Sequence, residues 1–338
     1  MKVSLIGFYG HNNPGDDRIL FCLKRLLHGH DIFVINGFAG LREHWETVNS
    51  CDYVIFGGGG LVQRGTGIHA GLFEDLRPPL FCLGISVEAV HSDNADLRKV
   101  LNEKSRFILV RDEKSAQAFG QSGKVVVGPD LTFLFPYEIA DCCDAASDVC
   151  GLNLLSWHFW HFEYKSFADK LLRRCAKRFP HFETFYPLRK WKPALLVEAV
   201  RQRFNTVLPL PFYSEPGHVS DKEVLSRFFE RFHSDTFSPE SMGRCGVVVA
   251  MRLHASIFSC QMGIPFVSLA YQPKNSQFCE SIGHGAYCMN LFQPSRFGEG
   301  IESLRRNQRE IRKSLLAASH DCHLGIRRLV EGLLQPLI

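Results

Sequence analysis

Short runs of consecutive apolar residues alternate with amphipathic stretches along the first half of the chain. Uninterrupted apolar runs are typical of strands that are buried on both faces of a parallel sheet, and the stretches between them have helical periodicity. The pattern predicts strands at residues 2–7, 31–36, 53–56, 80–85, 107–110 and 125–127. It predicts helices at residues 18–27, 93–102 and 113–119. This order favours a doubly wound α/β domain.

The alternation begins again after residues 136–148, a stretch with neither pattern that we interpret as a linker. Strands are predicted at residues 149–155, 183–186, 207–210, 247–251, 266–270 and 286–291. Helices are predicted at residues 164–179, 193–204 and 221–232. We therefore expect α/β architecture with two Rossmann-like doubly wound domains, at residues 1–140 and 149–295, followed by a C-terminal helical segment at residues 296–338. Such a pair usually binds its ligand in the crevice between the domains, at the carboxyl ends of the strands.

The composition is that of an ordinary globular protein. The 338 residues are 45% hydrophobic with a formal net charge of +4, which excludes a predominantly disordered chain. No stretch approaches the roughly 18 apolar residues of a membrane-spanning helix, and the N-terminal MKVSLIGFYG lacks the pattern of a signal peptide. The 12 cysteines include no C-x-x-C pair, so reduced, buried thiols and a cytoplasmic location are favoured over disulfides or a zinc ribbon.

Positive charge is concentrated near the C-terminus. From Arg296 to Arg328 there are eight Lys and Arg residues against four Asp and Glu residues. The arrangement fits the solvated face of a helix. It also fits peripheral contact with anionic lipid at the inner face of a membrane, and both interpretations stay open.

The first loop, residues 7–17, follows a strand and leads into a helix; its candidate site residues are Asn13, Gly15 and Asp16. Glycine lets the backbone approach a ligand, and a helix start offers free N–H groups. The alternative is a tight turn in which Asp16 caps the helix. The loop contains neither G-x-G-x-x-G nor a Walker sequence, so it gives little support to a dinucleotide or triphosphate site.

Four consecutive glycines at residues 57–60 end another predicted strand. They cost considerable backbone entropy, so we expect a loop in which Gly58 and Gly59 face a ligand. Two later strands of the first half are followed by Arg111 and Asp130. Both residues are therefore expected at the carboxyl edge of the sheet, where ligands bind in α/β folds.

The strand predicted at residues 247–251 is followed by Arg252 and His254, and the next strand by Lys274. Arginine offers a planar fork to carboxylate or phosphate, and histidine titrates nearest neutrality. On an extended segment, Arg252 and His254 would point to the same side. If these cations converge with Arg111, they suit a small, densely anionic ligand; a structural salt bridge and helix cap is the alternative.

An aromatic stretch at residues 156–162 follows the first strand of the second half and contains Trp157, His158 and Trp160. Aromatic faces stack on the apolar faces of sugar rings, so these residues are candidates for sugar binding. An aromatic core cluster explains the stretch almost as well. Metal binding is not expected, because an H-x-x-H on a loop without carboxylate partners makes a poor site.

Taken in order and spacing, GFYGHNNPGDDRIL, DYVIFGGGGLV, LVRDEKSAQAFGQSG, VGPDLTFLF and MRLHASIFSCQMGIPFVSLAYQPK resemble the polysaccharide pyruvyl transferases. The resemblance covers residues 3–283, and its most specific part is Arg-Leu-His followed by Gly-x-Pro and Tyr-x-x-Lys. It implies two Rossmann-like halves that face a cleft, as in GT-B glycosyltransferases. The first half would serve the acceptor and the second half the donor.

The resemblance also implies an activity: pyruvate is transferred from phosphoenolpyruvate to a sugar of a polysaccharide precursor, free or lipid-linked, as a cyclic ketal. Arg111, Arg252 and Lys274 would bind the phosphate and carboxylate of phosphoenolpyruvate, and His254 would act as acid or base. The acceptor or cleft residues would be Asn13, Gly15, Asp16, Gly58, Gly59, Asp130, Trp157, His158 and Trp160. No metal, further cofactor or nucleic acid is expected.

The chain departs from the family pattern at Pro14, at Asp17-Arg18 and at Leu131, all in the first half, so the departures bear on the acceptor more than on the donor. Two alternatives stay open. A GT-B glycosyltransferase with a nucleotide sugar would use the same architecture, although no clear ribose-binding Glu is present in the second half. A non-catalytic sugar-phosphate-binding protein would not need the Arg252, His254 and Lys274 set.

Overall fold

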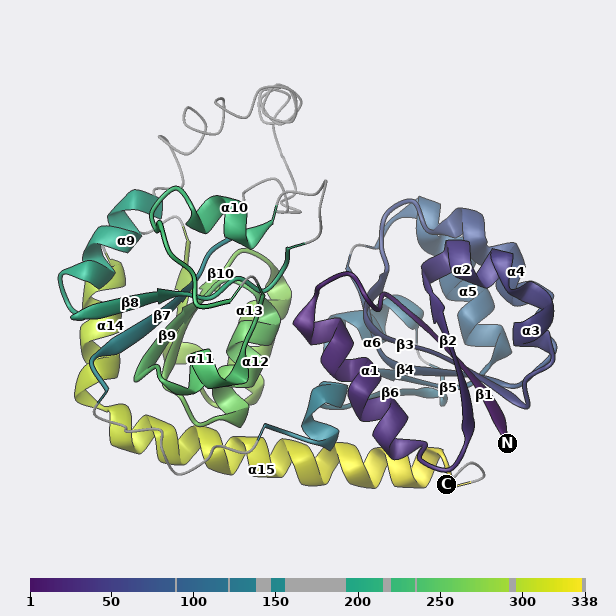
Figure 1. The fold of residues 1–338 in the computed structure, drawn as a ribbon. Coiled ribbons are helices and arrows are strands. Elements are labelled where there is room, and N and C mark those ends of the chain that lie inside the picture. The colour runs from purple at the N-terminus through teal and green to yellow at the C-terminus, as the bar shows by residue number, and fades with distance from the viewer. Residues whose placement is uncertain are drawn as a thin grey trace. The chain divides into compact units, whose positions relative to one another are not determined.

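The fold was analysed in a computed structural model, which describes residues 1–88, 90–120, 122–137, 147–155, 193–214, 220–234, 236–291 and 296–335 (Figure 1). The chain divides into two compact units. Unit 1 comprises Met1–Phe135 and Asp321–Ile338, and unit 2 comprises Pro136–His320. Most of the predicted linker, the helix predicted at 164–179 and the strand predicted at 183–186 lie outside the described residues.

Unit 1 is built on a sheet of six parallel strands in the order β2-β1-β3-β4-β5-β6. The strands are β1 (Lys2–Gly7), β2 (Asp31–Asn36), β3 (Tyr53–Val62), β4 (Leu80–Val87), β5 (Ser105–Val110) and β6 (Val125–Val127). Every strand predicted in this half is present. The four inner strands are largely buried, as is typical of a parallel sheet covered on both faces, whereas the edge strands β2 and β6 are only partly buried.

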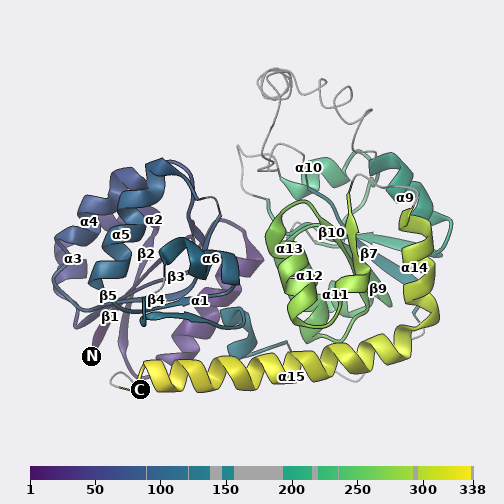
Figure 2. The same cartoon turned by 180° about the vertical axis from the view of Figure 1, so that it is seen from behind.

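The helices of unit 1 connect successive strands. They are α1 (Pro14–Leu26), α2 (Gly37–Glu43), α3 (Trp45–Asn49), α4 (Ala70–Glu74), α5 (Ala95–Lys104) and α6 (Glu113–Phe119), with short 3₁₀ turns η1 (Gly67–His69), η2 (Ser92–Asn94) and η3 (Leu131–Leu134). Buried side chains of α2 to α6 form one core with alternate residues of the strands, such as Phe56 and Ile108. The opposite face is covered by α1 and η3, which lie apart from α4 and α5 in both views (Figures 1 and 2).

The four glycines are part of strand β3, so the loop predicted at residues 57–60 is wrong. The glycines instead allow the backbone of β3 to approach its neighbours. A Cβ atom on Gly57 would lie 2.1 Å from the carbonyl oxygen of Leu83, and one on Gly58 would lie 2.4 Å from the side chain of Ile19 in α1. Gly58 and Gly59 also have φ angles of +84° and +91°, a region that side chains with a Cβ rarely adopt.

Unit 2 contains a sheet of five parallel strands, in the order β11-β10-β9-β7-β8 among the described residues. The strands are β7 (Val149–Asn153), β8 (Thr206–Pro209), β9 (Val247–Ala250), β10 (Phe266–Ala270) and β11 (Cys288–Asn290). The helices are α9 (Pro193–Arg201), α10 (Asp221–Leu225), α11 (Pro239–Gly243), α12 (Leu253–Gln261), α13 (Pro273–Ser281) and α14 (Phe297–Arg306), with the 3₁₀ turn η6 (Gly285–Tyr287). The helix predicted at 221–232 is shorter than expected, because after Leu225 the backbone forms tight turns instead of a regular helix.

The last helix, α15 (Gln308–Leu333), is continuous over 26 residues. Its first part belongs to unit 2 and its part from Asp321 onward to unit 1. Ile311 and Leu315 are buried in the first part, and Ile326 and Val330 in the second. No helix among the described residues is long and apolar enough to cross a membrane.

Candidate functional site

The first loop folds around the start of α1 in unit 1. The Asn13 side chain caps α1 by accepting a bond from the Gly15 N–H at 3.3 Å, and its amide donates to the Asp16 carboxylate at 2.5 Å. Asp16 is only 8% exposed, and a Cβ atom on Gly59 would lie 2.6 Å from its Oδ1. The structure thus brings together Asn13, Gly15, Asp16 and Gly59. The cap is Asn13, whereas the sequence suggested Asp16 for that role.

Tyr9 adds a buried hydroxyl that the sequence analysis did not single out. It donates to the carbonyl oxygen of Gly57 at 2.5 Å. Burial, together with the negative charge of Asp16, raises the pKa of the Tyr9 hydroxyl well above its usual value. The aromatic run of the first loop could have indicated a buried anchor, but only the fold shows that Gly57 receives its hydrogen bond.

Arg111 lies after β5 and is held by an ion pair with Asp130. Its Nη1 donates to Asp130 at 3.0 Å and its Nε donates to Ser86 at 2.6 Å, and the two charged side chains are only 6% and 4% exposed. Burial alone would lower the pKa of Arg111, but Asp130, with Glu88 and Asp16 nearby, raises it overall. Asp130 also accepts the Thr132 N–H at 3.0 Å and so begins η3.

In unit 2, strand β9 delivers Arg252 to a second ion pair. The buried carboxylate of Asp221 accepts three bonds from Nε and Nη2 of Arg252, at 2.7 to 3.1 Å. Asp221 is fully buried, whereas the Arg252 side chain is 18% exposed and its guanidinium lies 5.1 Å from the Tyr213 ring. Burial opposes the charge of Arg252, but Asp221 raises the pKa of the guanidinium overall.

Asp221 and Asn153 are site residues that the sequence analysis missed. Asn153, the last residue of β7, donates to Asp221 at 3.0 Å and accepts the Arg252 backbone N–H at 2.8 Å. Phe212 donates a further backbone N–H to Asp221 at 3.1 Å. Asn153 could have been predicted, because it is a polar residue at the carboxyl end of an apolar strand. The sequence around Asp221 indicated only that a helix begins there.

His254 lies in the first turn of α12, because this helix begins at Leu253. The expectation that Arg252 and His254 share one side of an extended segment is therefore wrong: Arg252 is the extended N-cap residue and His254 is helical. The His254 ring is half-buried and lies 5.8 Å from the Phe258 ring in the next turn. The two residues still begin the same helix at the carboxyl end of β9.

Lys274 lies in the first turn of α13, which follows the neighbouring strand β10. The fully buried Asn275 donates from its side-chain amide to the Met251 carbonyl oxygen at 2.9 Å, which ties the start of α13 to the end of β9. The starts of α12 and α13 thus lie at adjacent strand ends. Unit 2 therefore brings Arg252, His254 and Lys274 to one edge of its sheet, whereas Arg111 belongs to unit 1.

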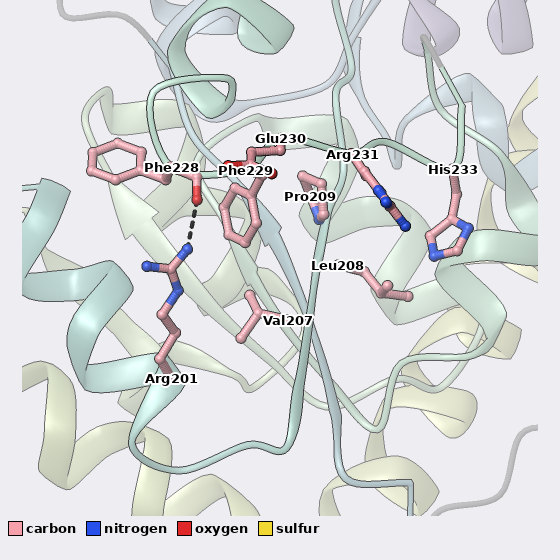
Figure 3. Close-up of a pocket in the computed structure, with 9 residues that line it drawn as sticks. All are labelled: Arg201, Val207, Leu208, Pro209, Phe228, Phe229, Glu230, Arg231 and His233. Atoms are coloured by element: carbon pink, nitrogen blue, oxygen red, sulfur yellow. Dashed lines mark hydrogen bonds between the residues drawn. The ribbon is translucent and has the colours of Figure 1, made fainter.

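Trp157, His158 and Trp160 lie outside the described residues. Over the residues that are described, no group of three or more His, Cys, Asp or Glu side chains could hold a metal ion. A pocket of about 460 Å³ is present elsewhere in unit 2, beside β8 (Figure 3). It is lined by Arg201, Val207, Leu208, Pro209, Phe228, Phe229, Glu230, Arg231 and His233, and so includes none of the predicted site residues.

Solved structures with a similar fold cover nearly the whole chain. HepE from Anabaena, in complex with UDP and glucose, matches with a TM-score of 0.56 at 12% identity, over 98% of this chain and 99% of that chain. UDP-GlcNAc 2-epimerase from Neisseria meningitidis, bound to UDP-GlcNAc, matches with a TM-score of 0.54 at 12% identity, over 99% and 100%. An α-glucosyltransferase in complex with UDP and a 13-mer DNA matches with a TM-score of 0.50 at 10% identity, over 98% and 99%. These similarities establish a GT-B-like fold, as the resemblance implied.

No curated protein matches the sequence significantly. The family model described as polysaccharide pyruvyl transferase matches residues 13–273, which is most of the chain. The matched range includes both ion pairs and the start of α12 with His254, and it ends at Pro273, one residue before Lys274. This match confirms the resemblance drawn from the sequence motifs. The chain belongs to the polysaccharide pyruvyl transferase family and is a transferase.

Proposed function

We propose that the protein transfers pyruvate from phosphoenolpyruvate to a sugar of a polysaccharide or glycan precursor, forming a cyclic ketal and releasing phosphate. Family membership supports the reaction class. The observation that carries the assignment of the donor site is the pair of helix starts in unit 2, where Arg252, His254 and Lys274 gather at adjacent strand ends.

Phosphoenolpyruvate has a phosphate and a carboxylate, and this edge offers complementary groups. Arg252 and Lys274 supply positive charge, and the first turns of α12 and α13 supply backbone N–H groups that have no partner within the helix. The three bonds from Arg252 to Asp221 fix the plane of the guanidinium before a ligand arrives. A charged group held in place in this way stabilises an anion more than a mobile one does, because no reorganisation is needed on binding.

Ketal formation requires a proton on the methylene carbon of phosphoenolpyruvate, which leaves an oxocarbenium-like centre at C2. One sugar hydroxyl attacks this centre, and a second hydroxyl then displaces phosphate. We assign His254 as the proton-transfer residue, either as the acid for carbon or as the base for a hydroxyl. Asn13, Gly15, Asp16, Gly58, Gly59 and Asp130 are proposed to serve the acceptor, together with Trp157, His158 and Trp160.

Arg111 remains a proposed ligand of the donor, but its contacts also indicate a structural role in unit 1. Both its Nε and its Nη1 donate hydrogen bonds within unit 1, and its side chain is almost fully buried.

The nine described cysteines are all free thiols, which supports the proposed cytoplasmic location.

The reaction is tested by incubating the protein with phosphoenolpyruvate and a panel of glycan precursors. The expected result is release of phosphate together with a pyruvyl ketal on one acceptor, detected by mass spectrometry. His254→Gln serves as the inactive control. Transfer of a sugar from a nucleotide sugar, with no use of phosphoenolpyruvate, would replace the proposal by a glycosyltransferase. Binding of phosphoenolpyruvate without turnover on any acceptor would favour a binding protein.

A further inference from the structure

Two stacks of a phenylalanine ring and an imidazole ring lie at the carboxyl ends of neighbouring strands in unit 1. Phe8 follows β1, and its ring centroid lies 3.8 Å from that of His11, with an angle of 5° between the ring planes. Phe38 follows β2 and stacks in the same way on His69 of η1, at 4.2 Å and 8°. Because β1 and β2 pair up to their last residues, the two stacks begin at adjacent strand ends. With Asn36 they form a group that we call the histidine platform: Phe8, His11, Asn36, Phe38 and His69.

The histidine platform has a firm base and a partly open surface. Phe8 and Phe38 pack against the hydrophobic core of unit 1. Each imidazole therefore covers the part of its phenylalanine ring that the core leaves open, and both His11 and His69 are half-buried. Ile68, beside His69, is 81% exposed, so this turn of the chain is open to solvent. The imidazole faces are thus within reach of a ligand and are backed by rings anchored in the core.

Polar atoms of the platform have hydrogen-bonding capacity that the described fold does not use. The Nε2 of His11 donates to the Oδ1 of Asn36 at 3.0 Å, which fixes this exposed amide. The side chain of Asn36 does not cap α2, so its amide N–H groups remain for another partner. The Nδ1 of His69 is buried and has no hydrogen-bond partner in the described part of the chain. Burial, together with the charge of Arg42, lowers the pKa of His69, so the ring is neutral at pH 7 and can accept a hydrogen bond.

We propose that the histidine platform binds the acceptor sugar. The C–H face of a pyranose ring lies on the imidazoles, and its hydroxyls bond to Asn36 and His69. The platform lies at the carboxyl ends of parallel strands, where α/β domains bind their ligands. A nucleotide could stack on the same rings, but its phosphate would meet no fixed charge within the platform, so a neutral sugar is the better ligand. The inference rests on the proposed function for the fate of the sugar and adds the contacts that recognise it.

The test is saturation-transfer NMR of the full-length protein with the methyl pyranosides of galactose, glucose and mannose, without phosphoenolpyruvate. At least one pyranoside should bind, with the strongest transfer to the C–H protons of one face of its ring. His11→Ala and His69→Ala should each weaken binding roughly two- to tenfold, the usual range for loss of an aromatic contact. His11→Phe keeps the flat face and should retain most of the binding. The matched control is His28→Ala, at an exposed position in the turn before β2, which should bind like wild type.

In the turnover assay, His11→Ala and His69→Ala should raise the KM for the acceptor and leave phosphoenolpyruvate affinity unchanged, and circular dichroism checks that each variant is folded. Failure of all three pyranosides to bind, or equal binding by these variants and His28→Ala, would overturn the proposal. Tighter binding of UMP than of any pyranoside, lost in the same variants, would identify a nucleotide site instead. Ketal formation with an unchanged acceptor KM would refute the platform alone. Pyranoside binding that the variants lose, without use of phosphoenolpyruvate, would retain the sugar site and refute the proposed reaction.

Discussion

The two sheets place an arginine at a similar point, just after an apolar strand, but in opposite electrostatic surroundings. In unit 1, Arg111 is paired with Asp130 and lies near Asp16 and Glu88, so carboxylates outnumber the cation. In unit 2, Arg252 is paired with the carboxylate of Asp221. Lys274 and the starts of α12 and α13 add positive potential at the same edge.

The exposures agree with this contrast, since the side chain of Arg111 is 6% exposed and that of Arg252 is 18% exposed. A buried ion pair that satisfies its own hydrogen bonds acts chiefly on stability, whereas a partly exposed one with positive groups around it can also bind an anion. We therefore expect an arginine substitution in unit 1 to affect stability, and the equivalent substitution in unit 2 to affect phosphoenolpyruvate binding as well as stability, because Asp221 is fully buried.

The largest effect is expected from His254→Gln, which keeps a hydrogen-bonding side chain but removes proton transfer. General acid–base catalysis contributes roughly 10²–10⁴-fold, so turnover should fall by that factor while phosphoenolpyruvate binding changes little. Steady-state phosphate release and calorimetric titration measure the two quantities. His233→Gln, at an exposed position of the same unit, is the matched control. Turnover near the wild-type value would show that His254 only positions the ligand. Asp16 and Asp130 would then be the next candidates for the proton-transfer residue.

Arg111→Ala tests whether the ion pair of unit 1 is structural. Removing one partner of a buried pair leaves the other charge uncompensated and costs about 3–5 kcal/mol of unfolding free energy. Urea denaturation of Arg111→Ala, Asp130→Ala and the double variant should show a double variant less destabilised than the sum of the singles. If Arg111→Ala instead keeps its stability and loses phosphoenolpyruvate affinity, Arg111 is a donor ligand, and the two arginines do not differ in role between the units.

Arg252→Ala and Lys274→Ala test the cationic edge of unit 2. Each should weaken phosphoenolpyruvate binding by about 1.5–3 kcal/mol, the usual range for a hydrogen bond to a charged group. Arg252→Lys should restore little, because an ammonium cannot reproduce the planar contact with Asp221. Arg244→Ala, an exposed arginine of unit 2, is the control. Unchanged phosphoenolpyruvate affinity in both alanine variants would show that the donor does not bind at this edge of the sheet.

The smallest effect concerns pH and His284 in unit 2. His284 is 5% exposed, its Nε2 lies 2.7 Å from the carbonyl oxygen of Phe266, and burial lowers its pKa. Because the folded pKa lies below the unfolded value of about 6.5, stability is complete above that value and is lost as pH falls toward the folded pKa. The loss should not exceed about 1.4 kcal/mol per pH unit for one group. In urea titrations below neutral pH, His284→Asn should show a smaller decline than wild type; an identical decline would assign it to other groups.

Local pattern was sufficient to predict most of the strands. Lys2–Gly7, Asp31–Asn36, Val125–Val127 and Phe266–Ala270 have the predicted bounds. In the inner strands this follows because a run buried on both faces of a parallel sheet must be continuously apolar. The edge strands Asp31–Asn36 and Val125–Val127 are only partly buried, and their short apolar runs were still sufficient. The pattern was insufficient at the four glycines. Their place in β3 depends on close contacts with Leu83 and Ile19. These residues belong to other elements, so the sequence next to the glycines does not predict the contacts.

The sequence by itself determined the family, the two α/β halves and the presence of Arg252, His254 and Lys274 after apolar strands, since these properties depend on order and spacing along the chain. Only the tertiary structure decided the partners. It joined Arg111 to Asp130, 19 residues away, and Arg252 to Asp221, 31 residues away. It also tied Asn275 to the end of β9 and began α12 at Leu253. The physical reason is that the cost of burying a charge is offset by whichever opposite charge the packed elements bring within hydrogen-bond distance, and that choice is made in space rather than along the chain.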